Sequence, residues 1–458
     1  MALAGPLFPC SRCAPTLPAI EPRPVTTRRI FRLWWPLAAS WLLMGAEVPL
    51  VAAFIARMPD EEIHLAAFGS LVYPLSVLVE APIIMLLAAS TALAKDWTSY
   101  CKLQRFMHVS GFGLTLVHGL IAFTPLFGFV ATDLMHAPEG TVAPGQVGLM
   151  IMTPWTWAIA YRRLQQGVLI RFERADAVII GTVVRLIVVV GVLLFGYQYG
   201  GERVSGIVLG SSAIAAGVLA EAVYAGWRVR PVLRERLHGA PPLDEPLNRG
   251  MFLRFYLPLA VTPMMTLIIH PIGAAAMNRM PNPLESVAAW GPVYGLVFMT
   301  RTAGFAFNEV TVTLLGSPGG ARALRRFAYG MVVCAIGVLG LIAWTPLGQL
   351  WFSGVIDLPP ELTEISVIAI ALASLMPGYS VLQSWYQGAL VFRHRTRGIT
   401  EAVVLYLVVT TVCLSIGVWL GSVRGIYFAI GSFTLAGLLQ TLWLRHRSAA
   451  TLREALAE

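Results

Sequence analysis

Long apolar segments, separated by short stretches that carry most of the charged residues, dominate the pattern along this chain. A helix needs about 20 apolar residues to cross a hydrocarbon layer of about 30 Å. The pattern therefore predicts twelve membrane-spanning helices and an all-α polytopic membrane protein. These helices are expected near residues 30–56, 63–94, 104–130, 143–170, 175–198, 204–227, 251–278, 284–314, 323–350, 362–391, 398–420 and 424–444.

The Lys and Arg residues between the segments indicate the orientation. With the N-terminal tail and every even-numbered connection inside, 27 basic residues lie inside and 4 outside. Arg162 and Arg163 count among the inside loop residues, and Arg185 and Arg301 stay within the membrane. Cytoplasmic loops carry an excess of Lys and Arg. We therefore expect a multi-pass protein of the cell inner (cytoplasmic) membrane with both termini in the cytoplasm.

The second half of the chain repeats the first. A shift of 222 along the chain matches RLWWPLA at 32–38 with RFYLPLA at 254–260, and gives 13 identities over 38 positions. The apolar composition alone would give roughly 3 or 4. A shift of 221 then matches Gln166 with Gln387, and a shift of 219 matches Gly206 with Gly425. Each half has six spans, so the repeat is parallel, and a substrate site is expected between the halves near the midplane.

The repeat and the polar segments divide the chain into five parts. A disordered cytoplasmic tail at 1–29 precedes an N-terminal six-helix lobe at 30–228. A cytoplasmic linker at 229–250 contains the helix-breaking run HGAPPLDEP. The C-terminal six-helix lobe covers 251–445, and a cytoplasmic tail covers 446–458.

Composition excludes the soluble class of proteins and several partners. The chain is 57% hydrophobic and 12% charged, which is typical of a protein embedded in a lipid bilayer. Its net charge of +9 follows from the loop asymmetry and indicates no nucleic-acid partner. Cys10 and Cys13 form a lone C-x-x-C pair without a second ligand pair, so no metal and no cofactor is predicted. We expect a monomer.

Helices 1 and 7 each carry a second proline, Pro49 and Pro271, at matching places in the repeat. A proline inside a helix removes one backbone hydrogen bond and clashes with the preceding turn, so each should kink the outer half of its helix. The repetition favours a moving part of the protein. A kink that serves only packing is the alternative.

Ionisable and polar side chains inside the predicted spans are few. They usually face a cavity or a partner, because burying a charge in the bilayer is costly. The candidates for substrate binding are Arg185, Arg301, His270 and Asn308, and the candidates for ion coupling are Glu47, Glu80, Glu221 and Glu309.

The charges suggest two roles and one structural alternative. Positive potential from Arg301, with Arg185 and His270, suits an anionic group, while Glu47, Glu80 or Glu221 exchanges protons with solvent. In the alternative, Glu80 and Arg185 simply neutralise each other between helices 2 and 5.

Twelve spans in two repeats, the Pro-Leu-Ala block of helices 1 and 7, and the Gly-x-Leu element of helices 4 and 10 resemble the multidrug/oligosaccharidyl-lipid/polysaccharide (MOP) exporter superfamily. WWPLA at 34–38, the pairs Pro49 with Arg57 and Pro271 with Arg279, and GIVLGSSAIAAGVLAE at 206–221 are most similar to the progressive ankylosis family and its bacterial relatives. The superfamily implies two lobes in a V, as in MATE transporters, and a secondary transporter that exports its solute in exchange for H⁺ or Na⁺. The progressive ankylosis branch implies small polyanions such as citrate, nucleotide or pyrophosphate.

The resemblance also bears on the coupling ion. It implies an acid in helix 7 for sodium-coupled multidrug members, and residues 251–278 contain none, so sodium is the less favoured ion. It implies an acid in helix 1 for proton-coupled members, and Glu47 is the only candidate there.

These features predict export of a small organic or phosphorylated anion by alternating access, coupled to protons. Two alternatives share the fold: flipping of a lipid-linked oligosaccharide, whose diphosphate the same arginines would hold, and efflux of cationic drugs, which the glutamates would bind. A membrane-embedded transferase is disfavoured, because no loop is long enough for a soluble domain and no phosphate loop, metal set or catalytic triad is present.

Overall fold

The computed structural model describes residues 25–172, 174–200, 204–241, 247–393, 395 and 397–457. Cys10 and Cys13 lie outside the described residues, as does most of the predicted N-terminal tail. Every regular element within the described ranges is helical. The all-α prediction is therefore confirmed.

The N-terminal half contains six long helical segments, several of them interrupted. Short π-helical (η1, η3, η5) and 3₁₀ (η2) turns join some of the α-helices. The elements are α1 Thr27–Gly45, α2 Glu47–Ile55, α3 Glu61–Ala67, η1 Phe68–Val72, α4 Tyr73–Glu80, η2 Ala81–Ile83, α5 Leu86–Leu93, α6 Trp97–Phe123, α7 Leu126–Gly128, η3 Phe129–Leu134, α8 Glu139–Arg171, α9 Ala175–Tyr199, α10 Gly206–Val232 and η5 Leu233–Leu237.

The C-terminal half follows the same order. Its elements are α11 Arg249–Leu267, α12 Ile269–Met277, α13 Pro283–Leu314, α14 Gly320–Trp344, α15 Leu347–Gln349, the π-helical η6 Leu350–Ile356, α16 Pro360–Leu372, α17 Met376–Phe392, α18 Arg397–Leu420 and α19 Gly425–Ala457.

Ten helical segments among the described residues are long and apolar enough to cross a membrane. The other two predicted spans, 143–170 and 284–314, form α8 and α13, which are 33 and 32 residues long. At a rise of about 1.5 Å per residue, either helix has a length of roughly 50 Å, more than the hydrocarbon layer requires. The twelve predicted segments are thus all long helices.

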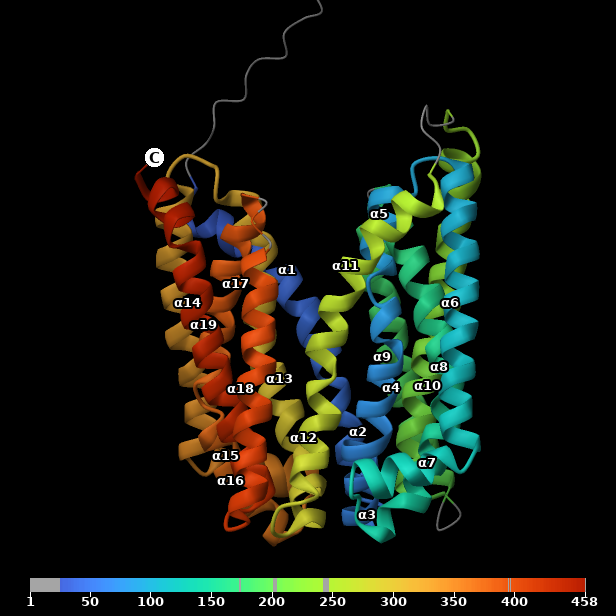
Figure 1. Cartoon of the computed structure of the whole chain (residues 1–458), viewed down its shortest axis with the longest axis vertical. Coiled ribbons are helices and arrows are strands. Elements are labelled where there is room, and N and C mark those ends of the chain that lie inside the picture. The colour runs from blue at the N-terminus through green and yellow to red at the C-terminus, as the bar shows by residue number, and fades with distance from the viewer. Residues whose placement is uncertain are drawn as a thin grey trace, which may run out of the picture.

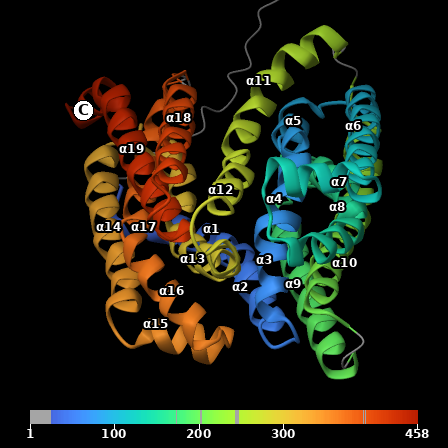
Figure 2. The ribbon, with the colours of Figure 1, turned by 60° about the horizontal axis from the view of Figure 1, so that its bottom comes forward.

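The helices form two bundles that lie close together at one end of the molecule and diverge toward the other (Figure 1). Both ends of the described chain lie at the end where the bundles diverge. The view turned by 60° shows α12 and α13 next to α2 and α3 where the bundles meet (Figure 2). We call these bundles the N lobe and the C lobe, after the half of the chain that supplies most of each.

The repeat seen in the sequence extends to local backbone geometry. Asp60 and Asn282 are equivalent positions of the repeat, and both adopt a left-handed conformation, with φ of 55° and 54°. Thr124 and Thr345 are also equivalent. Each accepts from a backbone N–H two residues on at 3.3 Å and donates to a carbonyl four residues back at 2.6 Å. The two halves therefore share turns as well as helices.

Helices 1 and 7 are both interrupted, at equivalent positions of the repeat. The break in helix 1 is at Ala46, between α1 and α2, and the break in helix 7 is at Ile268, between α11 and α12. Each lies three residues before a proline, Pro49 or Pro271. A proline cannot donate to the carbonyl four residues earlier, which accounts for a break at this distance.

The inner halves of these two helices pack on the opposite lobe. α1 packs on α13 and α14, and Trp34 Nε1 donates to the carbonyl of Ala303 at 2.8 Å. α11 packs on α4 and η2, and Tyr256 Oη donates to the carbonyl of Pro82 at 2.6 Å. Beyond the breaks, α2 packs on α10 of its own lobe and on α13 of the C lobe, and α12 packs on α18 and α19 of its own lobe and on η1 of the N lobe. Helices 1 and 7 thus connect the two lobes.

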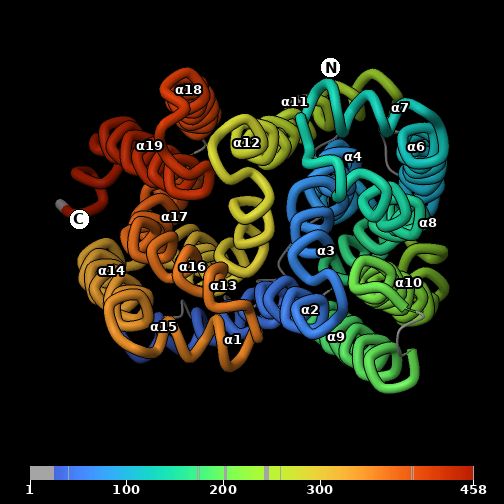
Figure 3. Tube along the Cα trace, turned by 90° about the horizontal axis from the view of Figure 1, so that it is seen from below, coloured from blue at the N-terminus to red at the C-terminus, as the bar shows by residue number. Residues whose placement is uncertain are grey.

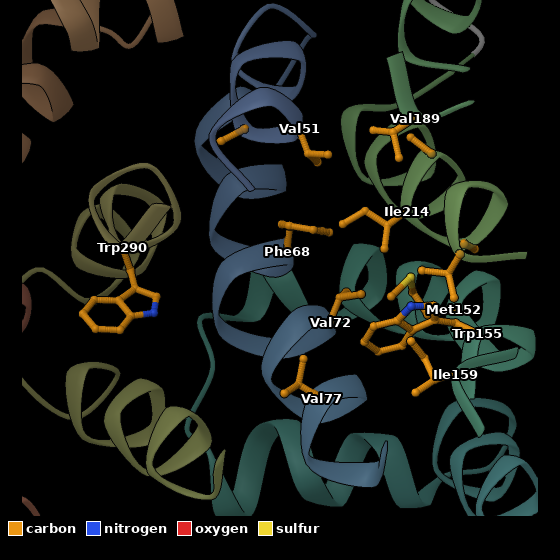
Figure 4. Packing of buried hydrophobic residues seen from close by; sticks show 14 of the residues in the cluster. Val51, Phe68, Val72, Val77, Met152, Trp155, Ile159, Val189, Ile214 and Trp290 are labelled. Carbon is orange, nitrogen blue, oxygen red and sulfur yellow. The ribbon is translucent and has the colours of Figure 1, made fainter. Parts of the chain in front are cut away.

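Apolar side chains from several elements form the core of the N lobe. Figure 4 shows Val51 of α2, Phe68 of η1, Val189 of α9 and Ile214 of α10 facing one another, with Trp155 of α8 beside them. All five are at most 3% exposed. Trp290 of α13 lies apart from them, because it belongs to the C lobe.

Two helical segments run past their predicted ends, and a third contains two arginines that were counted in a loop. α8 ends at Arg171, one residue after the predicted span 143–170, so Arg162 and Arg163 lie within a helix, and their assignment to a loop is wrong. α10 and η5 continue to Leu237, into the predicted linker. α19 continues to Ala457, through residues expected to form the C-terminal tail.

Candidate functional site

A network of buried charges occupies the N lobe, where helix 1 breaks. Arg185 of α9 donates from Nε to Oε1 of Glu47 at 2.9 Å and from Nη2 to the other carboxylate oxygen, so the pairing is bidentate. Glu47 is the first residue of α2. It is 5% exposed. Arg185 Nη1 also lies 3.8 Å from Oε2 of Glu221 on α10.

α8 completes the network from the opposite side. Arg162 forms an ion pair with Oε2 of Glu221, and Gln166, one turn further along α8, donates to Oε1 of the same carboxylate at 2.9 Å. Glu221 is fully buried. Its two oxygens are therefore bonded to one cation and one amide, with Arg185 close by, which satisfies a charge that could not otherwise remain in an apolar interior.

Glu80 and Arg163 lie near the network without joining its hydrogen bonds. Glu80 Oε2 and Arg163 Nε are buried and have no hydrogen-bond partner within the described part of the chain. The alternative in which Glu80 and Arg185 neutralise each other is wrong, since Arg185 pairs with Glu47 and Glu221 instead. Glu80 is 7% exposed. It is a buried carboxyl group with unused hydrogen-bonding capacity.

A cavity of about 330 Å³ lies in the C lobe. Side chains of helices 7, 8, 10, 11 and 12 line it. Many are aliphatic, and the others comprise one arginine, several aromatic rings, and several neutral amides and hydroxyls. They include Arg301, His270, Trp290, Tyr294, Phe305, Tyr379, Ser380, Gln383, Gln387, Tyr406, Phe433 and Gln440.

Arg301 of α13 is the cation of this cavity. Its Nε donates to Ser380 Oγ at 2.7 Å, and its guanidinium lies 5.4 Å from the ring centre of Phe305 and 5.8 Å from that of Tyr379. Across the ranges that the structure describes, Arg301 forms no ion pair with an acid. A guanidinium held by rings and a hydroxyl keeps donors for an anionic ligand.

The other polar residues of the cavity hold one another in place. Gln383 Nε2 lies 3.1 Å from the acceptors Gln440 Oε1, Thr441 Oγ1 and the carbonyl of Gly437. The rings of His270 and Tyr294 meet edge to face, with centroids 5.1 Å apart. Apart from Arg301, no Lys, Arg, Asp or Glu side chain lines the cavity.

The structure divides the candidate residues between the two lobes. Arg301 and His270 line the C-lobe cavity, whereas Arg185 lies in the N-lobe network with Glu47 and Glu221. Asn308 is half-buried and Glu309 exposed, and neither lines the cavity.

Sequence reasoning missed several residues of both sites. Arg162 was not considered as a site residue because it had been assigned to a loop. Gln166 and Gln387 did carry a signal, because they match in the repeat, but their side chains received no role. Gln383 and Gln440 were also missed, since the cost of burying a charge does not single out an uncharged amide.

Two repeat-related arginines join the lobes at the end away from the termini. Arg57 donates from Nη2 to the carbonyl of Val355 at 2.9 Å and from Nη1 to that of Ile356 at 3.1 Å. Arg279 donates from Nη2 to the carbonyl of Leu134 at 2.7 Å. Leu134 and Val355 correspond in the repeat, so the two contacts are reciprocal. In the view from below, α2 and α3 lie beside α12 and α13 at this junction (Figure 3).

No group of three or more His, Cys, Asp or Glu side chains that could hold a metal ion occurs in the described ranges.

No protein-family model matches the sequence, and no curated protein matches it in sequence. The fold does have solved counterparts. A multidrug resistance MATE family transporter of the MOP superfamily, in its inward-facing conformation, aligns with a TM-score of 0.72 at 12% identity, over 93% of this chain and 99% of that one. A structure titled as the outward-facing conformation of such a transporter aligns at 0.58, with 13% identity, over 93% and 97%.

The fold is shared beyond drug transporters. The lipid II flippase MurJ, in an inward closed conformation, aligns with a TM-score of 0.58 at 11% identity, over 90% of this chain and 88% of that one. The narrower resemblance to the progressive ankylosis family stays a prediction. The chain has the fold of the MATE transporters of the MOP superfamily, which MurJ also adopts.

Proposed function

We propose that this protein is a secondary active transporter that exports a small organic or phosphorylated anion across the cytoplasmic membrane by alternating access. The observation that carries this proposal is Arg301, a cation without an acidic partner among the described residues, in the wall of a cavity. An anion would supply the missing charge.

The rest of the lining suits such a ligand. Small-molecule sites are mostly apolar and carry a few polar groups that fix orientation. Here rings such as Trp290 and Phe433 would cover the apolar part of the solute, while Gln387, Gln440 and Ser384 offer amide and hydroxyl groups to its polar part. His270 stands in the same wall and adds a donor or an acceptor, according to its protonation.

Proton coupling is assigned to the N lobe. Protonation of Glu47 would remove the charge that holds Arg185, and Glu47 lies where helix 1 breaks, so the gain of a proton would loosen the contact between α2 and α9. Glu221 and Glu80 are the other acids within this region. Sodium is the less favoured ion, because helix 7 contains no acid.

The proline breaks provide the hinges in this proposal. Each inner half contacts the opposite lobe, α1 through α13 and α11 through η2 and α4, and each outer half contacts both lobes. The lobes can therefore rock only if these helices bend, and Pro49 and Pro271 lie next to the places where they can.

Two other functions share this fold. MurJ, a lipid II flippase by its title, is among the structural neighbours. An arginine such as Arg301 could equally hold the diphosphate of a lipid-linked oligosaccharide. Efflux of a cationic drug is disfavoured at this cavity, because its one charged group is itself a cation.

The experiment compares the spent medium of cells that express the wild type, Arg301→Ala, Arg326→Ala or no protein, by untargeted mass spectrometry of small anions. Arg326 is a matched control, since it is an exposed arginine of α14 outside the cavity. We expect one or more anions to accumulate with the wild type and the control, and to fall at least about tenfold with Arg301→Ala, because one lost charge-assisted contact costs a factor of this order.

Two results would contradict the proposal. Accumulation that survives in Arg301→Ala would remove Arg301 from the transport path. Identical media in all four cultures would favour a lipid-linked solute that never reaches the medium. The coupling is tested separately: if Glu47→Gln keeps the full dependence of export on a pH gradient, Glu47 is not the coupling residue.

A further inference from the structure

A groove between α6 and the start of α11 lies outside both of the sites described above. It encloses about 740 Å³ and lies at the end of the molecule where the lobes diverge. Three basic residues, Lys102 and Arg105 of α6 and Arg249 of α11, line it together with Phe106, Val109, Leu103, Leu247, Asn248, Phe252 and Leu253.

Charge and apolarity are ordered along the groove in the same way on both helices. Arg105 precedes Val109 by four residues on α6, and Arg249 precedes Leu253 by four residues on α11. Four residues of helix span about 6 Å. Val109 is 67% exposed and Leu253 48%, so both present apolar surface outward. The groove therefore changes, over about one helical turn, from basic at the membrane surface to apolar within the membrane.

No acid among the described residues neutralises the cations in this groove. Lys102 Nζ donates to the carbonyl of Leu247 at 2.8 Å, which leaves its charge unpaired. None of the three basic residues takes part in an ion pair within the part of the chain that the structure describes. A ligand with an anionic head and an apolar tail matches this arrangement.

We infer that this groove binds an anionic phospholipid of the cytoplasmic leaflet, with its phosphate among Lys102, Arg105 and Arg249 and an acyl chain along Val109 and Leu253. Anionic lipids of that leaflet attract basic residues at the membrane surface, and basic pockets between helices bind their head groups. The site rests on the predicted orientation of the chain, and not on the proposed anion export.

The equivalent place in the second half of the repeat shows which features are particular to this groove. The ring contact of Phe106 with Tyr256 recurs between Phe327 and Trp34, so α14 and α1 meet as α6 and α11 do. Of the three basic residues, only Arg105 has a basic counterpart at that second place, Arg326. Ala323 and Thr27 stand where the groove has Lys102 and Arg249. The start of α1 carries other arginines, Arg28, Arg29 and Arg32, which line a separate pocket beside Leu314, so the arrangement of Lys102, Arg105 and Arg249 occurs at one of the two equivalent places.

A lipid in this groove would act on the transport cycle. α11 is the inner half of helix 7, and it packs on the N lobe through Tyr256, Phe252 and Leu247. A lipid between α6 and α11 bridges the same two elements. It therefore strengthens the attachment of α11 to the N lobe.

The test is a thermal-unfolding titration of the full chain in detergent with phosphatidylglycerol, and with phosphatidylcholine for comparison. The variants are Arg105→Gln with Arg249→Gln, and Arg326→Gln as the matched control. Both changed residues of the double variant are exposed, so it should fold. We expect phosphatidylglycerol to raise the unfolding temperature of the wild type and the control. Its apparent Kd should be about 30-fold weaker for the double variant, because each basic residue contributes roughly a factor of five.

Three outcomes would overturn the inference. They are an equal effect of phosphatidylglycerol on the double variant, an equal effect of phosphatidylcholine on the wild type, and an equal effect of inorganic phosphate alone. The last would indicate a site for a soluble anion. None of them bears on Arg301, so the proposed export of an anion stands or falls separately.

Discussion

The two lobes contain equivalent helices of the repeat, but they differ in the charge of their buried polar residues. The repeat relates Arg162 of the N lobe to Gln383 of the C lobe, and Glu221 to Gln440. Arg162 and Glu221 form a buried ion pair, and Gln383 donates to Gln440 at 3.1 Å. One pair of positions thus holds an ion pair in one lobe and an amide–amide hydrogen bond in the other.

The contrast extends to the neighbouring positions. Arg185 corresponds to Tyr406, which lines the C-lobe cavity, and Arg301 corresponds to Val79 in helix 2. The N lobe therefore contains several charges that neutralise one another, whereas the C lobe contains one cation that nothing in its cavity neutralises. A self-neutralised network responds to a proton, and an unpaired cation responds to an anion. This difference is the reason for assigning coupling to one lobe and binding to the other.

The largest expected effect comes from breaking the charged pair. Glu221→Ala leaves Arg162 buried without its carboxylate, and removal of one partner of a buried pair costs about 3–5 kcal/mol. Gln440→Ala, its counterpart, removes one neutral hydrogen bond, for which about 1 kcal/mol is expected. Thermal unfolding of both variants in detergent would measure the difference.

The control for this prediction gives the N lobe, at these two positions, the glutamines that the C lobe has. Arg162→Gln combined with Glu221→Gln removes both charges at once, so the double variant should be more stable than Glu221→Ala. If Glu221→Ala and Gln440→Ala were equally stable, the buried pair would contribute no more than the amides, and the contrast between the lobes would have no energetic basis.

The junction between the lobes provides the next comparison. Arg57 makes two backbone hydrogen bonds to the opposite lobe and Arg279 makes one. Hydrogen bonds from a charged donor contribute about 1.5–3 kcal/mol, so Arg57→Ala should shift the equilibrium toward opening of this end by about tenfold or more, and Arg279→Ala by less. Labelling of Ala274→Cys with an impermeant maleimide would measure opening, because Ala274 is fully buried near this junction.

The labelling needs a background without the five native cysteines. Arg424→Ala is the control at the same end, because the ion pairs of Arg424 stay within the C lobe. Its Nη1 lies 3.5 Å from Glu285 Oε2, and its Nη2 lies 3.9 Å from Glu361 Oε1. Equal labelling rates in Arg57→Ala and Arg424→Ala would mean that the contact between lobes does not hold this end closed.

The sequence predicted the helices well, because burial in a bilayer imposes a strong and simple pattern. It also predicted the repeat, since prolines and arginines such as Pro49 and Arg57 rarely coincide by chance in apolar segments. It did not predict that α1 and α11 pack on opposite lobes. That arrangement depends on the direction each helix takes after its break, which no local pattern specifies.

The sequence predicted which charged residues belong to the candidate sites better than it predicted which of them form pairs. Arg185 was expected to bind the substrate or, in the alternative, to neutralise Glu80, and instead pairs with Glu47 and Glu221. Which acid a buried arginine meets depends on the rotation of three helices about their axes, and the spacing along the chain leaves this open. Arg162 was misplaced for a different reason: the excess of Lys and Arg on the cytoplasmic side led us to count it in a loop, although it falls within the predicted span 143–170.

The smallest expected effect concerns two threonines whose local structure is the same in both lobes. Thr124 and Thr345 are both half-buried and make the same two hydrogen bonds, so Thr124→Ala and Thr345→Ala should each cost about 1 kcal/mol of unfolding free energy. Thr→Ser at either position keeps the hydroxyl and should cost less. Because the local structure is the same, the two alanine variants should agree with each other in the same unfolding assay. The two alanine variants could instead differ in unfolding free energy as much as is expected for Glu221→Ala and Gln440→Ala. The lobes would then differ in stability at positions without charge, and the buried charges could not be identified as the cause of the difference.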